Sequence, residues 1–139
     1  MKRNASARWT GDLKTGKGTL TTGSKTLADA AYSFAARFEQ GQGTNPEELL
    51  AAAHAGCFTM ALSSQLGKAG LTAEWLETSC IITLDPGSLT ITASALTLRG
   101  KVPGATREQF EAASAAAKEG CPVSKLYRTE ISLQATLEA

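Results

Sequence analysis

The stretch from Asn45 to Leu66, NPEELLAAAHAGCFTMALSSQL, constrains the fold of this chain more than any other. Asn45 is a favoured N-cap residue, a proline suits the first helical position after it, and the next two glutamates complement the positive end of a helix dipole. Between the first and last turns, only His54 and Thr59 carry polar groups besides the thiol of Cys57. The sequence therefore predicts a central helix that is covered on most sides, either by the rest of the chain or by a second copy of it.

Length and composition predict one globular domain over residues 1–139. The chain is 42% hydrophobic, and its 14 basic and 13 acidic residues leave a net charge of +1. So small a net charge gives no electrostatic reason to bind nucleic acid or an anionic membrane. Neither partner is expected.

The same composition bears on where the protein works. The opening residues MKRNASARWTG lack the apolar core of a secretory signal, and the longest apolar stretch contains His54 and is predicted to be too short to cross a membrane. Three cysteines, an odd number, argue against a framework of structural disulfides and for reduced or redox-active thiols. A cytoplasmic protein is expected.

Periodicity predicts an α+β order of elements, not a doubly wound parallel sheet. Thr-rich runs at 5–11 and 16–22 favour a hairpin, whereas 25–38 fits either a strand near Leu27 or a helix. The later predicted elements are a strand at 74–84, a turn at 85–87, a strand at 88–102 with a bulge near Ala95, a helix from Thr106 to Gly120 and a strand at 130–138.

The three cysteines fall in different settings. Cys80 alternates with apolar residues on the inward face of a predicted strand, so it is expected to be an inert core residue. Cys57 follows His54 by about one helical turn, where an imidazole either stabilises a thiolate or packs in the core with a hydrogen bond. Cys121 stands before a proline that favours the start of a short helix, and it is either a redox-active thiol or a buried one.

Other catalytic and cofactor chemistries find no support in the sequence. There is no CxxC or HxxxH pair and only one histidine, so a metal site is not expected. The nucleophile-elbow pattern GxSxG is absent, as are the glycine spacings of phosphate-binding loops. No metal or cofactor is predicted, and the cysteines are left as the candidate nucleophiles.

Three segments together resemble the osmotically inducible protein C (OsmC) family of thiol peroxidases. They are ARFEQGQGTNPEELLAAAHAGCFTMAL at 36–62, GCPVS at 120–124 and the closing TEISLQATLE at 129–138. The resemblance extends over nearly the whole chain. It implies an OsmC-like fold, in which antiparallel sheets surround a central buried helix within an intertwined two-fold homodimer.

The resemblance also implies that hydroperoxides are reduced by a two-cysteine cycle. Cys57 matches the peroxidatic and Cys121 the resolving cysteine, and Arg37 and Glu47 match the family's arginine and glutamate. In such a cycle the Cys57 thiolate becomes a sulfenic acid, Cys121 condenses with it to a disulfide, and an external dithiol, suggested to be a lipoyl-type protein, restores both thiols. A guanidinium beside Cys57 would favour its thiolate, and Glu47 would hold that guanidinium in place.

Helix geometry adds a constraint to this predicted site. Glu47 and Cys57 stand on one helix, separated by roughly 15 Å along its axis. One chain cannot bring both to one site, so Glu47, together with Arg37, is predicted to come from a partner subunit of a homodimer. Apolar residues near the site would favour organic hydroperoxides over hydrogen peroxide. The candidates, each equally well explained as core, are Phe38, Phe58 and Met60.

Two other functions would use the same residues. A non-enzymatic redox sensor or thiol-dependent binding protein would oxidise the cysteine pair once, whereas a peroxidase consumes many equivalents of peroxide when a dithiol is supplied. A cysteine hydrolase would pair Cys57 with His54 and would not need Cys121. Turnover and substitution of Cys121 therefore separate the three functions.

Overall fold

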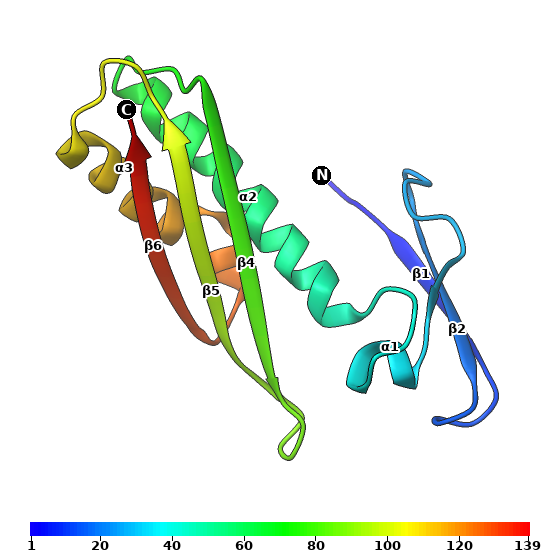
Figure 1. The fold of residues 1–139 in the computed structure, drawn as a ribbon. Coiled ribbons are helices and arrows are strands. Elements are labelled where there is room, and N and C mark those ends of the chain that lie inside the picture. Colours follow the sequence, from blue (N-terminus) through cyan, green and yellow to red (C-terminus); the bar gives the residue numbers. More distant parts are fainter. The chain divides into compact units, whose positions relative to one another are not determined.

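The computed structural model describes every residue from 1 to 139 (Figure 1). The chain forms two compact units, Met1–Leu49 and Leu50–Ala139. Each unit holds its own three-stranded sheet, β1 to β3 in the first and β4 to β6 in the second. The expectation of a single domain over the whole chain stays a prediction.

The first unit begins with the predicted hairpin. Strands β1 (Ala5–Thr10) and β2 (Lys17–Thr22) pair antiparallel. The turn between them is held by Asp12, whose carboxylate accepts the backbone N–H groups of Lys14 and Thr15, each at 2.9 Å. Such a carboxylate closes a tight turn locally, which is why the hairpin could be predicted from sequence.

The segment with ambiguous periodicity contains both a strand and a helix. Strand β3 (Ala30–Tyr32) pairs with β2, and α1 (Phe34–Phe38) follows it directly. Ser33 separates the two, because its hydroxyl caps α1 by accepting a backbone N–H at 3.1 Å. A strand at Leu27 is wrong: the Leu27 carbonyl accepts the N–H of Thr22 at 2.9 Å and closes a loop.

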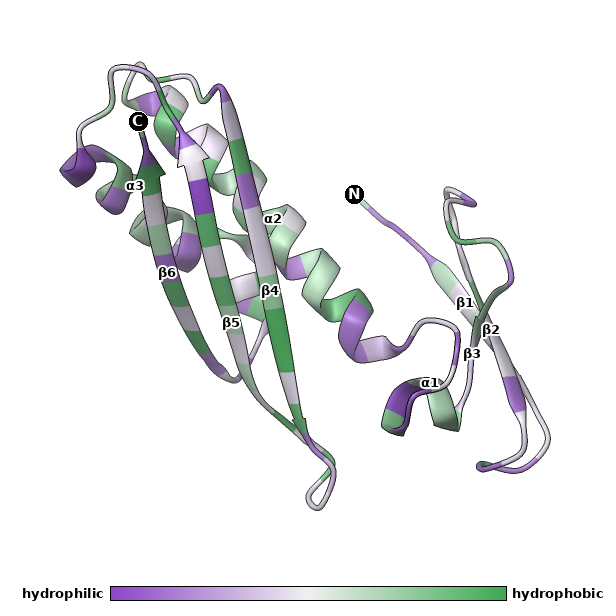
Figure 2. Ribbon diagram, in the orientation of Figure 1, coloured by the Kyte–Doolittle hydropathy of each residue, from purple (hydrophilic) through white to green (hydrophobic).

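The second unit is built on a mixed sheet. Strands β4 (Trp75–Asp85) and β5 (Thr90–Lys101) pair antiparallel, and β6 (Glu130–Glu138) lies parallel to β5 after a crossover through α3 (Arg107–Gly120). Figure 2 shows hydrophobic and hydrophilic residues alternating along these strands. Helices α2 (Pro46–Lys68) and α3 lie on one face of the sheet (Figure 1). The α+β class is confirmed, but the expectation of antiparallel sheets is wrong for this unit, because the crossover through α3 returns β6 parallel to β5.

The bulge lies elsewhere than the sequence predicts. Thr83 pairs with Ala93 and Leu84 with Ile91, so the extra residue of β5 is at position 92 and not near Ala95. The physical reason is Ser94, which is fully buried and hydrogen-bonded to a side chain of α2. A polar residue takes an inward position that the hydrophobic pattern could not assign to it.

Helix α2 packs through one stripe of residues. Its buried side chains are His54, Phe58, Leu62 and Leu66, spaced four residues apart, and the apolar ones join a core that includes leucines of β5 and Phe110 of α3. Positions outside this stripe are half-buried or exposed, and Met60 is 77% exposed. A single chain therefore covers one face of α2, and the predicted cover on most sides would need a second chain.

Helix α2 spans Pro46–Lys68, close to the predicted bounds, but the expectation that it is too short to cross a membrane is wrong by length and composition. Its 23 residues, with a mean hydropathy of 1.2 over 18 of them, would suffice to cross a membrane by length and composition alone. Its contacts are those of a core helix, because Phe58 and Leu62 pack against the sheet and the buried His54 is hydrogen-bonded to two serines.

Helix α3 begins with a capping box, as predicted. The Thr106 hydroxyl accepts the backbone N–H of Gln109 at 3.1 Å, and the Gln109 side chain accepts the backbone N–H of Thr106 at 2.9 Å. The predicted apolar stripe is also present, with Phe110, Ala113 and Ala117 buried. The cap fixes where α3 starts, and its other end lies next to Cys121.

We predict that Thr106→Ala lowers the free energy of unfolding by about 1 kcal/mol, because the backbone N–H of Gln109 loses the hydroxyl that accepts it. Urea unfolding followed by circular dichroism measures the change. Thr106→Ser, which keeps the hydroxyl, is the control and should unfold like the unaltered protein. Equal losses in the two variants would show that the cap contributes nothing.

Candidate active site

Cys121 owes its position to the proline that follows it. A residue before proline is driven out of the helical region, and Cys121 is extended, with φ −61° and ψ 127°. Helix α3 therefore ends there, and the short helix α4 (Pro122–Leu126) starts with proline at a position where its missing N–H costs nothing. This break between two helices turns the Cys121 side chain into the protein.

The two cysteines from α2 and from the α3–α4 junction are in direct contact. The Sγ atoms of Cys57 and Cys121 lie 2.8 Å apart, the Cys121 thiol donates to Cys57, and both thiols are free. Their environments differ, because Cys121 is fully buried whereas Cys57 is only half-buried. A reagent from solvent therefore meets Cys57 first.

The Cys57 thiol is not activated by its own surroundings. Burial is the main cause that raises the pKa of Cys57, and the neighbouring Cys121 raises it further. The backbone N–H of Val123 acts in the opposite direction, because it hydrogen-bonds the sulfur and favours the thiolate. None of the groups that shift this pKa is a cationic side chain.

His54 does not pair with Cys57. Its Nδ1 lies 2.6 Å from the Ser94 hydroxyl and its Nε2 lies 2.8 Å from the Ser124 hydroxyl, so both ring nitrogens are occupied. The edge of the ring meets Tyr127, whose hydroxyl donates to the Leu50 carbonyl at 2.8 Å. Burial lowers the pKa of His54. The interpretation of His54 as a packed, hydrogen-bonded core residue is confirmed, and the geometry of a cysteine hydrolase is absent.

Cys80 faces inward, as its register predicts. It packs against the core of the second unit, and its Sγ lies 3.3 Å from the Ser94 hydroxyl. Burial raises the pKa of the Cys80 thiol, although the Ser94 hydroxyl acts in the opposite direction. A protonated, inward thiol is a poor nucleophile. Its expected inertness toward oxidants stays a prediction.

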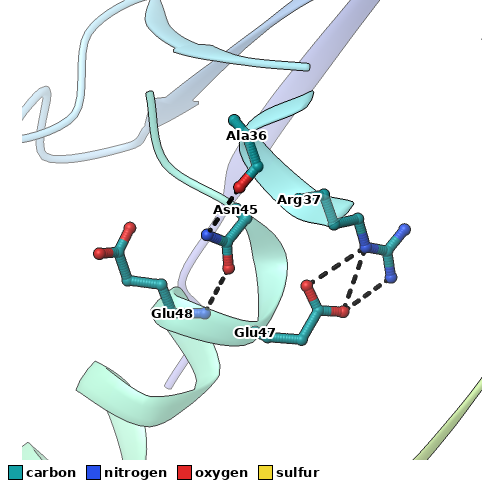
Figure 3. Close-up of polar contacts among 5 residues, drawn as sticks. All are labelled: Ala36, Arg37, Asn45, Glu47 and Glu48. Atoms are coloured by element: carbon teal, nitrogen blue, oxygen red, sulfur yellow. Dashed lines mark hydrogen bonds and ion pairs between the residues drawn. The ribbon is translucent and has the colours of Figure 1, made fainter. Parts of the chain in front are cut away.

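Arg37 and Glu47 form a second pair, within the first unit (Figure 3). The Arg37 Nε donates to both carboxylate oxygens at 3.2 Å, and its Nη2 donates to one of them at 2.8 Å. Asn45 joins the helices that carry them, because its side chain accepts the N–H of Glu48 at 2.8 Å and donates to the Ala36 carbonyl at 3.3 Å. This N-cap, predicted from sequence, therefore also ties the start of α2 to the backbone of α1 next to Arg37.

A pocket of about 270 Å³ lies beside this guanidinium in the first unit. Its wall is mostly aromatic, and the Arg37 guanidinium also lies 5.1 Å from the centre of the Phe38 ring. The lining residues are Trp9, Leu13, Tyr32, Ser33, Phe34, Arg37 and Phe38. Such a pocket suits an apolar molecule with one polar end.

Of the residues predicted for the site, the structure brings Cys57 together with Cys121 and, separately, Arg37 with Glu47. Phe58, a candidate lining residue, is fully buried in the core. The residues that sequence reasoning missed are Ser94, Ser124 and Tyr127, which surround His54. Ser124 lies within the recognised GCPVS motif, but no sequence spacing could have linked it to His54, 70 residues away.

The fold and the paired thiols define the class: a small α+β redox protein that holds a dithiol in contact. A sequence model of the family described as OsmC-like protein matches residues 39–136. The chain belongs to the OsmC-like protein family.

Individual relatives agree with this assignment. The chain is 44% identical to Peroxiredoxin OsmC of Escherichia coli (strain K12), over 100% of this chain and 99% of that protein, and the same figures hold for Peroxiredoxin OsmC of Shigella flexneri. Among solved structures, the organic hydroperoxide resistance protein OhrB of Bacillus subtilis has a TM-score of 0.67 at 26% identity, covering 99% of this chain and 98% of that one. The OsmC-like protein from Mycoplasma pneumoniae has a TM-score of 0.77 at 14% identity, covering 100% and 99%, and shows likeness of fold. The predicted family is confirmed, and the relatives support the predicted enzyme class, a peroxidase.

We predict that His54 stays neutral in the folded protein as the pH falls through 6.5. It is the only histidine, so its ring-proton NMR signals need no assignment. Burial lowers its pKa from 6.5, and the unfolded chain therefore binds more protons below that pH. The contribution of this group to stability is complete above pH 6.5 and is lost as the pH falls below it.

The protein in concentrated urea is the reference and should titrate near 6.5. His54→Gln should remove this part of the pH dependence of unfolding. A folded-state midpoint at or above 6.5 would contradict a neutral imidazole held between two serine hydroxyls.

Proposed function

We propose that this protein is a thiol-dependent peroxidase that reduces organic hydroperoxides to alcohols through Cys57 and Cys121. The observation that carries the proposal is the contact of two free thiols with unequal exposure. The half-buried Cys57 is reachable by a peroxide, and the fully buried Cys121 is reachable only by Cys57. This inequality supports a peroxidatic role for Cys57 and a resolving role for Cys121.

The chemistry proceeds in two steps. The Cys57 thiolate attacks the terminal peroxide oxygen, the O–O bond breaks, and the alkoxide leaves and takes up a proton to become the alcohol. The resulting Cys57 sulfenic acid condenses with the Cys121 thiol to a disulfide and water. An external dithiol then reduces the disulfide by thiol–disulfide exchange. A lipoyl-type protein is the reductant we favour.

Arg37 supplies the activation that the surroundings of Cys57 lack. Burial raises the pKa of Cys57, and a guanidinium beside the sulfur would favour the thiolate and would donate to the oxygens of the breaking peroxide bond. Glu47 holds the edge of the Arg37 guanidinium, where Nε and Nη2 donate to its two carboxylate oxygens, which is a positioning role. Lysine would not reproduce this geometry.

The site is completed by a second subunit. Glu47 and Cys57 lie on the same continuous helix, roughly 15 Å apart along its axis, so both serve one site only if Arg37 and Glu47 come from a partner. The open side of α2, with Met60 and small residues exposed, would give two copies a surface on which their helices pack. We therefore propose an intertwined two-fold homodimer, with one domain per chain and α2 buried at its centre.

The pocket beside Arg37 supports a preference for organic hydroperoxides. Its aromatic wall would bind the alkyl part of the substrate while the guanidinium binds the peroxide group. Hydrogen peroxide has no apolar part and would gain nothing from this wall. Free cysteines fit a reducing compartment, and we propose the cytoplasm as the location.

We predict that one equivalent of cumene hydroperoxide added to the reduced protein removes two thiols and joins Cys57 to Cys121, leaving Cys80 free. Thiol counting and peptide mass spectrometry measure this. Cys80→Ser is the matched control and should behave like the unaltered protein, whereas Cys121→Ser should accumulate a Cys57 sulfenic acid. Loss of no thiol, or oxidation of Cys80 instead, would overturn the mechanism. With excess dithiol and peroxide, a single turnover would indicate a sensor.

We also predict that two inactive variants restore activity when mixed. Arg37→Ala lacks the guanidinium and Cys57→Ser lacks the nucleophile, yet a mixed dimer has one site with both groups intact. Half of randomly re-formed dimers are mixed, so equal amounts should recover about a quarter of the unaltered activity.

Subunits must be exchanged in mild denaturant before the assay. Mixing Cys57→Ser with Cys121→Ser is the control, because both cysteines come from one chain and no complete site forms. No recovery in the first mixture, although mixed dimers are detected by native mass spectrometry, would place Arg37 and Cys57 of one chain in one site.

A further inference from the structure

We infer that His54 is a positioning residue for the resolving step: through Ser124 it holds α4, and with it Cys121, against Cys57. The inference rests on the proposed two-cysteine cycle and deepens it. The observation is the 2.8 Å contact from His54 Nε2 on α2 to the Ser124 hydroxyl on α4. Helix α4 begins at Pro122, immediately after Cys121.

The His54 imidazole occupies a core position of α2, where the side chain is normally apolar. His54 belongs to the same buried stripe as Phe58 and Leu62 and is fully buried like them, although its ring is polar. Burying an imidazole costs free energy that an apolar side chain would avoid, and this cost is offset only when both ring nitrogens are hydrogen-bonded. Ser94 on the sheet and Ser124 on α4 meet that requirement, so the ring joins three elements.

Helix α4 has few other means of staying in place. It has five residues, too few for a stable helix by itself, and its last residue, Leu126, is 73% exposed. Its own backbone bonds join Lys125 to the Cys121 carbonyl and Tyr127 to the Val123 carbonyl, each at 3.1 Å. These bonds close the turn without fixing it to α2. Other contacts do fix it: Val123 packs against the core and its backbone N–H bonds the Cys57 sulfur, and the Tyr127 hydroxyl donates to α2. Ser124 is the residue within α4 whose side chain is hydrogen-bonded to α2, through His54.

The tether matters for one step in particular. During resolution the Cys121 sulfur attacks the sulfur of the Cys57 sulfenic acid. The S–S bond forms, the S–O bond breaks, and the hydroxyl leaves as water with the proton of the Cys121 thiol. The rate depends on how closely the two sulfurs are held, whereas attack of Cys57 on peroxide does not involve Cys121. Loosening α4 should therefore slow the second step more than the first.

Ser124→Ala and Ser94→Ala form a matched pair. Each removes one buried hydroxyl from the same imidazole, but only Ser124 is on α4. The reduced variants are mixed with one equivalent of cumene hydroperoxide and quenched at short times. Peroxide loss, trapped sulfenic acid and disulfide are measured, and urea unfolding shows how much stability each variant loses.

In Ser124→Ala the sulfenic acid should accumulate and disulfide should form on the order of tenfold to a hundredfold more slowly, with peroxide consumed at nearly the unaltered rate. Ser94→Ala should form disulfide at nearly the unaltered rate even when it loses as much stability. Equal resolving rates in the two variants, whether fast or slow, would overturn the inference. If the unaltered protein forms no Cys57–Cys121 disulfide, the proposed function itself fails.

Hydrogen exchange of the unaltered, reduced protein tests the tether without any substitution. The amides of Lys125 and Tyr127 close α4 and should exchange as slowly as those in the middle of α3, because the imidazole holds the turn. Fast exchange of these two amides beside a protected α3 would show that α4 is not held, and would overturn the inference whatever Ser124→Ala does.

Discussion

The second unit depends on the burial of one stripe of α2. Packing of Phe58, Leu62 and Leu66 against β5 and α3 fixes the rotation of the helix about its own axis. A residue next to this stripe is neither fully buried nor fully open, and Cys57 is such a residue. The same rotation carries His54 into the core and turns the Cys57 thiol toward the end of α3. Hydrophobic packing thus decides which face of α2 carries chemistry.

Packing and reactivity make opposite demands on Cys57. The environment that holds its sulfur in place also withdraws it from water, which raises its pKa and favours the unreactive thiol. A cation is the usual remedy, but an unpaired guanidinium inside a core would be costly. In this chain the guanidinium is carried by Arg37, already paired with Glu47 and 38% exposed. Charge brought to the thiol by association, instead of being buried within one chain, would resolve the conflict.

Local signals were sufficient to predict much of the structure. The capping box at Thr106, the N-cap at Asn45 and the alternation of β6 each depend on residues close in sequence, and each is present. What sequence reasoning missed depends on long-range contacts. The bulge at position 92 follows from the buried Ser94, whose partner is 40 residues away, and the tie between His54 and Ser124 spans 70. The contact of Cys57 with Cys121 was expected only through family resemblance, because no periodicity relates residues on different helices.

The contact between the two thiols joins positions 64 residues apart, across β4, β5 and α3. A covalent bond there would enclose most of the second unit in a loop, and loop-closure entropy alone would stabilise the folded chain by about 4 kcal/mol at 25 °C. The oxidised protein would then resist heat and proteases better than the reduced protein, and reduction of the disulfide would make the chain easier to unfold. Its resistance to unfolding in a cell would report how much peroxide it had recently met.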